Sequence, residues 1–101
     1  MKSIIFTALV IALLLPMTVF GQLSGKEVYE KACASCHKSG VAGSPVLGDK
    51  KAWEPRIAKG MDEMYESAIE GKGIMPARGG HKSLTDDKVK AAVDYLIEER
   101  K

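Results

Sequence analysis

The sequence predicts a small all-α domain, and three observations support this fold class. Apolar side chains recur with helical spacing in segments that follow helix-start signals. No segment alternates apolar and polar residues over the length of a strand. The chain has 101 residues, enough for one small domain. Its 15 basic and 13 acidic residues give a net charge of +2, which excludes a strongly basic nucleic-acid-binding protein.

Residues 1–21 are predicted to be a cleavable secretory signal peptide. A positively charged start is followed by an apolar run from Ile4 to Leu15, and a cleavage site is expected before Gln22. The apolar run is shorter than the roughly 20 residues of a membrane span. An uncleaved membrane anchor is the less favoured alternative. The exported domain is therefore expected to comprise residues 22–101 and to be periplasmic.

Apolar side chains are scarce in the exported domain. Leu, Ile, Val and Phe account for 13 of the 80 residues from 22 to 101, which is below the roughly 20% under which a packed core becomes doubtful. A core alone rarely gives a chain of this size more than about 3–5 kcal/mol of stability. We therefore expect another apolar body to complete the interior.

The first half of the domain should contain two helices separated by a loop. Ser24 and Glu27 have the spacing of a capping box, which predicts a helix from Gly25 to about the two cysteines. Residues 39–51 contain three glycines and a proline, which is typical of a loop. A short helix is predicted over residues 53–59, with its proline in the first turn.

The second half should contain two amphipathic helices separated by a glycine-rich loop. The first is predicted from residue 61 and ends at Gly71, and the loop extends to residue 84. The last helix should begin at Thr85, with a hydrophobic staple between Leu84 and Val89. The two apolar stripes comprise Met61, Met64, Tyr65, Ala68 and Ile69, and Val89, Ala92, Val93, Leu96 and Ile97.

One short motif, at residues 33–37, indicates which cofactor the chain binds. Cys33, Cys36 and His37 form the pattern C-x-x-C-H, which is the attachment pattern of c-type haem. Because residues i and i+3 share one face of a helix, both thiols can add to the vinyl groups of one porphyrin. The histidine that follows is then placed to bind the iron. A covalent haem would also supply the apolar mass that the chain lacks.

The motif has three alternative interpretations: a structural disulfide, a thiol redox site and a zinc site. A disulfide across C-x-x-C leaves His37 unexplained, and a thioredoxin-like redox site needs a βαβ unit that the pattern does not predict. A zinc site needs four ligands. The candidates would be the two cysteines, His37 and His81, without a second C-x-x-C pair.

Met75 is the expected sixth ligand of the iron. It lies in the loop Gly71-Lys72-Gly73-Ile74-Met75-Pro76, whose glycines permit close backbone approach. Met61 and Met64 lie on a helical stripe, where methionine usually fills the core. His81 is the alternative ligand. Thioether ligation favours ferrous iron and raises the reduction potential.

These motifs together resemble the class I c-type cytochromes, and the chain is most similar to the bacterial cytochrome c5 family. The resemblance extends over residues 23–101 and implies one covalent haem c per chain, with helices and long loops wrapped around it. It also implies thioether links at Cys33 and Cys36 and axial ligation by His37 and Met75. Several members have a further cysteine pair near the C-terminus, which this chain does not have. The matching segments are Gly25-x-x-x-Tyr29, Cys33 to His37, Gly43-Ser44-Pro45-x-Leu47-Gly48-Asp49, Trp53-x-Pro55-Arg56-Ile57, Gly71-Lys72-Gly73-x-Met75-Pro76 and Lys90 to Leu96.

The resemblance also implies contacts around these groups. The first and last helices should cross where Gly25 and Tyr29 meet Tyr95 and Leu96. The carbonyl of Pro45 should accept a hydrogen bond from the histidine ring, because a ligating histidine usually donates its second N–H. Two further residues, Trp53 and Arg56, are candidates for contacts to a haem propionate. Core packing is the alternative for the tryptophan, and solvation for the arginine.

The expected function is one-electron transfer by a protein that is not itself an enzyme. Its expected partners are membrane or periplasmic redox proteins, such as cytochrome complexes and terminal oxidases or reductases, with no nucleic acid and no small-molecule substrate. A haem-based sensor or enzyme with a labile sixth ligand is the alternative. A basic ring around the haem edge would favour acidic partners. Its candidate members are Lys38, Lys50, Lys51, Lys72, Arg78 and Lys82.

Overall fold

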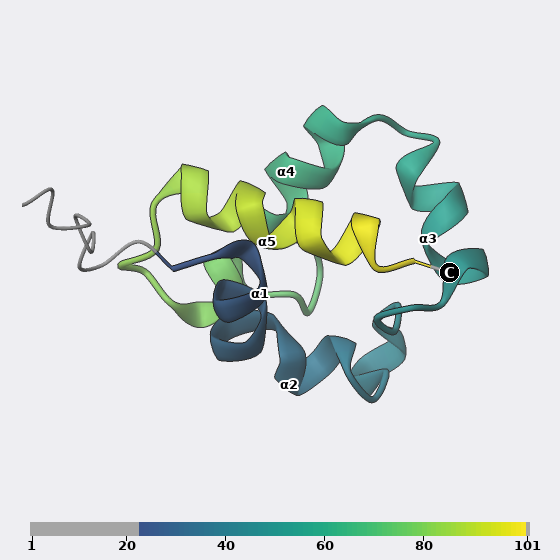
Figure 1. The fold of residues 1–101 in the computed structure, drawn as a ribbon, viewed down its shortest axis with the longest axis horizontal. Helices are drawn as coiled ribbons and strands as arrows, with labels where there is room; N and C mark the ends of the chain where they lie inside the picture. The colour runs from purple at the N-terminus through teal and green to yellow at the C-terminus, as the bar shows by residue number, and fades with distance from the viewer. Residues whose placement is uncertain (1–22, 101) are drawn as a thin grey trace, which may run out of the picture.

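The computed structural model describes residues 23–100, and Figure 1 shows their arrangement. The predicted signal peptide lies outside the described residues. Within residues 23–100 all regular elements are helical, apart from an isolated bridge between Lys72 and Met75. The all-α prediction is therefore confirmed. In chain order the elements are α1 (Gly25–Val28), η1 (Tyr29–Cys33), α2 (Ala34–His37), η2 (Val41–Gly43), α3 (Lys50–Ile57), α4 (Met61–Glu70), η3 (Ala77–Gly80) and α5 (Asp86–Glu98).

The first helical segment follows the prediction with one difference. The capping box is present: the Glu27 N–H donates to Ser24 Oγ at 3.2 Å, and the glutamate side chain accepts from the Ser24 N–H. The segment then widens into a π-helical turn, η1, in which the Ala34 N–H bonds to the Tyr29 carbonyl. Such turns are rare and often occur at functional sites. Here the turn ends at Cys33, the first residue of the C-x-x-C-H motif.

The predicted start of the next helix was wrong. Helix α3 begins at Lys50 rather than residue 53, because Asp49 caps it by accepting a hydrogen bond from the Ala52 N–H at 3.3 Å. Pro55 consequently lies inside the helix rather than in its first turn. Aspartate after glycine was interpreted as loop composition, although it is also a strong N-cap residue.

Helices α4 and α5 agree with the sequence analysis. Helix α4 ends at Gly71, and Thr85 caps α5 by accepting a hydrogen bond from the Lys88 N–H at 3.4 Å. Leu84 and Val89 are both buried, as expected for the hydrophobic staple. A hydrogen bond also connects the two helices: the hydroxyl of Tyr65 in α4 donates to the carboxylate of Asp94 in α5 at 2.5 Å.

The first and last helices cross at the centre of the molecule (Figure 1). A methyl group on Gly25 would overlap the Ala91 carbonyl, so only glycine permits this approach. One turn further on, the rings of Tyr29 and Tyr95 pack with their centroids 5.4 Å apart. The expected crossing is therefore confirmed.

Within the described residues, no helix is long and apolar enough to span a membrane.

The buried apolar side chains form one small cluster around this crossing. Many other apolar side chains remain only partly buried beside the cluster, among them Cys33, Met64 and Met75. The cluster comprises Val28, Tyr29, Ala32, Trp53, Ala68, Leu84, Val89, Ala92, Val93, Leu96 and Ile97.

Candidate functional site

The C-x-x-C-H motif lies at the end of the first helical segment. Cys33 and Cys36 are half-buried and are not joined in a disulfide. His37 is 7% exposed, and its ring Nδ1 lies 2.8 Å from the carbonyl oxygen of Pro45. The Leu47 N–H also donates to the His37 carbonyl at 2.8 Å. The loop that follows the motif therefore fixes both the backbone and the ring of the histidine.

Trp53 of α3 also contacts the loop that follows the C-x-x-C-H motif. Its side chain is 3% exposed and donates its indole N–H to the Val46 carbonyl at 2.9 Å. Its ring packs on the His37 ring with centroids 5.6 Å apart. Trp53 is therefore packed in the core beside His37, and its contact with a haem propionate stays a prediction.

Arg56 lies on the exposed side of α3. Its Nη1 donates to the carbonyl of Ala52 in its own helix at 2.6 Å. The expected propionate contact of Arg56 stays a prediction.

The surroundings of Cys33 suit an uncharged sulfur. Burial raises the pKa of the Cys33 thiol to about 11, so the thiol stays protonated at neutral pH. A thioether carries no charge and meets no such desolvation cost. The apolar setting of Cys33 is therefore compatible with a covalent link to a porphyrin.

The loop that carries Met75 lies against the same helical segment. Lys72 and Met75 exchange two backbone hydrogen bonds of 3.0 Å, which closes a tight turn between these two residues. Met75 is partly buried against the core. Further along, Gly79 touches the Ala32 carbonyl so closely that a methyl group would overlap it. The methionine loop (residues 71–84) and the cysteine-bearing segment (residues 29–37) are thus in direct contact.

The other candidate ligands are placed differently. Met61 and Met64 lie on α4, partly buried against the core. His81 lies in the turn before α5, where its N–H bonds to the Arg78 carbonyl at 3.0 Å. Within residues 23–100 the structure contains no group of three His, Cys, Asp or Glu side chains that could hold a metal ion.

The donor set fits a haem. With Nδ1 of His37 directed to the Pro45 carbonyl, Nε2 is the ring atom available to a metal, and no described residue is hydrogen-bonded to it. Two sulfurs precede the histidine at the required spacing. The neighbouring loop offers a thioether at Met75. Sequence reasoning did not identify Val46 and Gly79, because their roles depend on backbone contacts with partners distant in the chain.

Comparisons with known proteins agree with this fit. Residues 22–96 match the family model described as "Cytochrome C oxidase, cbb3-type, subunit III". The chain is 48% identical over 82 residues to cytochrome c-555 of Chlorobaculum tepidum, covering 77% of this chain and 76% of that protein. It is 37% identical over 78 residues to cytochrome c5 of Azotobacter vinelandii, covering 75% and 94% of the two chains.

Solved structures show the same fold. The cytochrome c in a crystal structure of an electron transfer complex with nitrite reductase is 43% identical, with a TM-score of 0.72 over 79% of this chain and 100% of that chain. A mono-haem ferrocytochrome c from Shewanella putrefaciens is 38% identical, with a TM-score of 0.68 over 79% and 98%.

The fold and the site define a class I monohaem c-type cytochrome. The chain belongs to the cytochrome c family, as its sequence resemblance indicated. It accordingly carries one covalently bound haem c, and its activity is electron transfer.

The contact of Trp53 with the loop at Val46 leads to a prediction. Trp53→Phe keeps an aromatic ring beside the histidine but leaves the partly buried Val46 carbonyl without its donor. The free energy of unfolding of the haem-bound protein should fall by about 1–3 kcal/mol, measured by denaturant titration. The pH dependence of the midpoint potential should be unchanged. Unchanged stability together with an altered pH dependence would instead place the indole N–H on a propionate.

Proposed function

We propose that the haem is linked through Cys33 and Cys36 and that His37 and Met75 are its axial ligands. The observation that carries this proposal is the hydrogen bond between His37 Nδ1 and the Pro45 carbonyl, which leaves Nε2 as the ligand atom. The contact of Gly79 with Ala32 supports the assignment of Met75, because it brings the methionine loop against the cysteine-bearing segment.

The protein side chains set the redox properties of the bound group. Haem c supplies a ferric–ferrous couple that accepts and releases one electron. The Pro45 carbonyl orients the His37 ring and increases the basicity of its ligand nitrogen. The thioether of Met75 favours the ferrous state and raises the potential. With His37 and Met75 as ligands, the iron would need no substrate, and the bound group would exchange single electrons with a docked partner.

We further propose that the protein works in the periplasm as a carrier between respiratory redox partners. The predicted signal peptide over residues 1–21 supports export, followed by function of the domain over residues 22–101. The electron transfer complex of a structural neighbour with nitrite reductase supports reductases as one partner class. Terminal oxidases and membrane cytochrome complexes are the other candidates.

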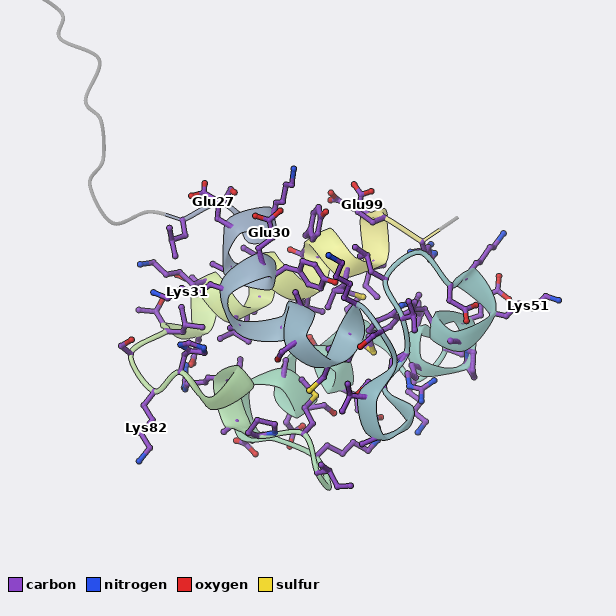
Figure 2. The ribbon with its side chains drawn as sticks, turned by 90° about the horizontal axis from the view of Figure 1, so that it is seen from below. Glu27, Glu30, Lys31, Lys51, Lys82 and Glu99 are labelled. Carbon is purple, nitrogen blue, oxygen red and sulfur yellow. The ribbon has the colours of Figure 1, made fainter. Side chains whose placement is uncertain are left out.

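The surface beside Met75 favours an apolar docking centre over a uniform basic ring. Ile74 is 83% exposed and immediately precedes the proposed ligand. Three of the six candidate ring residues are paired with acidic side chains within the protein: Lys50 with Glu54, Lys72 with Glu63 and Arg78 with Asp86. Figure 2 shows two others, Lys51 and Lys82, at opposite ends of the molecule. We therefore propose that Ile74 contacts the redox partner.

Replacement of Met75 tests the assignment of the sixth ligand. Met75→Ala should abolish the ferric absorption band of sulfur-ligated haem, lower the midpoint potential and allow the reduced protein to bind carbon monoxide. Absorption spectra of the oxidised and reduced protein, with and without carbon monoxide, measure these changes. Met64→Leu and His81→Asn are the matched controls and should keep the wild-type spectra.

Two results would contradict this assignment. Persistence of the sulfur band in Met75→Ala would exclude Met75 as the ligand. Carbon monoxide binding by the wild-type protein would favour the alternative function, a haem-based sensor or enzyme with a labile sixth ligand.

Replacement of Ile74 tests the docking surface. Ile74→Ser removes an exposed apolar side chain and should slow electron transfer to a reductase or oxidase that the wild-type protein reduces. The expected decrease is about threefold to tenfold, as for a side chain near the centre of an interface. Stopped-flow kinetics measure the rate, and the midpoint potential should not change.

Lys51→Ala is the matched control for this experiment and should leave the rate unchanged. An unaffected rate in Ile74→Ser, combined with a steep fall of the wild-type rate with ionic strength, would favour the basic ring instead.

A further inference from the structure

The loop from Pro76 to Leu84 contains a backbone conformation that needs an explanation. Arg78, within η3, has φ +55° and ψ +30°, and Gly79 has φ +61° and ψ +20°. A non-glycine residue in the left-handed region costs on the order of 1 kcal/mol or more and persists only where other contacts hold it. The arginine therefore makes contacts that offset this cost.

The guanidinium of Arg78 makes two such contacts. Nη1 donates to the Leu84 carbonyl at 2.7 Å, and Nη2 lies 2.6 Å from Oδ1 of Asp86. Leu84 is buried in front of α5, and Asp86 is in the first turn of that helix. The planar guanidinium suits two simultaneous contacts, which lysine cannot reproduce with the same geometry.

We call the contacts of Arg78 with Leu84 and Asp86 the latch. The loop that carries the latch lies between the beginning of α5 and the cysteine-bearing segment. On one side, the guanidinium fixes the loop to α5. On the other side, the adjacent Gly79 rests on the carbonyl of Ala32, one residue before the first cysteine of the motif. The Gly79 N–H also donates to the Pro76 carbonyl at 3.2 Å, directly after Met75. A movement of the methionine away from the site therefore strains a segment that is held on both sides.

The partly buried contact should dominate the energy of this latch. Asp86 is 59% exposed and the arginine side chain 27%, so the ion pair alone contributes little. The hydrogen bond to the Leu84 carbonyl is partly buried, and its loss would leave the carbonyl of a buried residue without this donor.

We propose that Arg78 is a positioning residue for Met75, whose guanidinium holds the methionine loop and so limits access of competing ligands to the sixth position. This inference rests on the proposed role of Met75 as the axial ligand. The loop opens when an external ligand displaces the methionine. The latch makes opening less favourable, so the apparent affinity for external ligands depends on Arg78.

Imidazole binding to the ferric, haem-bound protein tests this proposal. Arg78→Lys keeps the charge but loses the two-pronged contact. Arg78→Gly removes the side chain and fits the left-handed backbone without strain, so it provides a second variant if the first does not fold. In both, we expect imidazole to bind about tenfold more tightly than in the wild-type protein, measured by the loss of the sulfur-ligation band on titration.

Two control variants separate positioning from general stability. Arg100→Lys alters an arginine whose Nη1 donates to the Ile97 carbonyl at 2.9 Å, far along the chain from the methionine loop. Tyr65→Phe removes the hydrogen bond to Asp94 and lowers the stability of the contact between α4 and α5. Both should keep the imidazole affinity of the wild-type protein.

The outcomes distinguish this inference from the proposed function. If the wild-type protein shows the sulfur band but the Arg78 variants bind imidazole with unchanged affinity, Arg78 has no positioning role and Met75 ligation stands. An equal gain in affinity in Tyr65→Phe would reduce the effect to general stability and overturn the inference. If the wild-type protein has no sulfur band, the ligand assignment itself fails.

Discussion

The shortage of apolar side chains is the constraint on which the rest of the structure depends. The buried cluster comes mainly from α1, η1 and α5, and many other apolar side chains remain only partly buried next to it. A small chain with so few apolar residues gains little from its own packing. A covalently bound haem would supply the missing apolar body. Cys33 and Met75 are among the partly buried residues that border the core, so two of the residues proposed to hold the haem lie where the packing is incomplete.

The helices and loops each fix a different part of the proposed haem site. The crossing of α1 and α5, made possible by Gly25, fixes the segment that carries the cysteines. The loop after the motif is held between His37 and Trp53 by hydrogen bonds from both residues, which sets the orientation of the imidazole. The methionine loop is closed at its base and rests on Ala32 through Gly79. The proposed ligation by His37 and Met75 would suit outer-sphere electron transfer, because ligands held in this way would not need to rearrange when the iron changes oxidation state.

Local signals in the sequence were sufficient for much of this structure. The capping box at Ser24 and Glu27, the cap at Thr85 and the end of α4 at Gly71 all use neighbouring residues, so they could be predicted. The hydrogen-bond partner of His37 was expected only from the family resemblance. The start of α3 was missed because Asp49 suits both a loop and a helix cap. The π-helical turn and the contacts of Arg78 depend on tertiary neighbours, and no local pattern indicates them.

The most direct test of this account is the folding of the chain without haem. Residues 22–101 with Cys33→Ala and Cys36→Ala would be produced without the cofactor and compared with the haem-bound wild-type domain by far-ultraviolet circular dichroism and thermal unfolding. If the haem completes the core, the haem-free domain should be largely unfolded and should show no cooperative transition. A helical haem-free domain that melts cooperatively would contradict the central claim, because the polypeptide alone would then form a sufficient core.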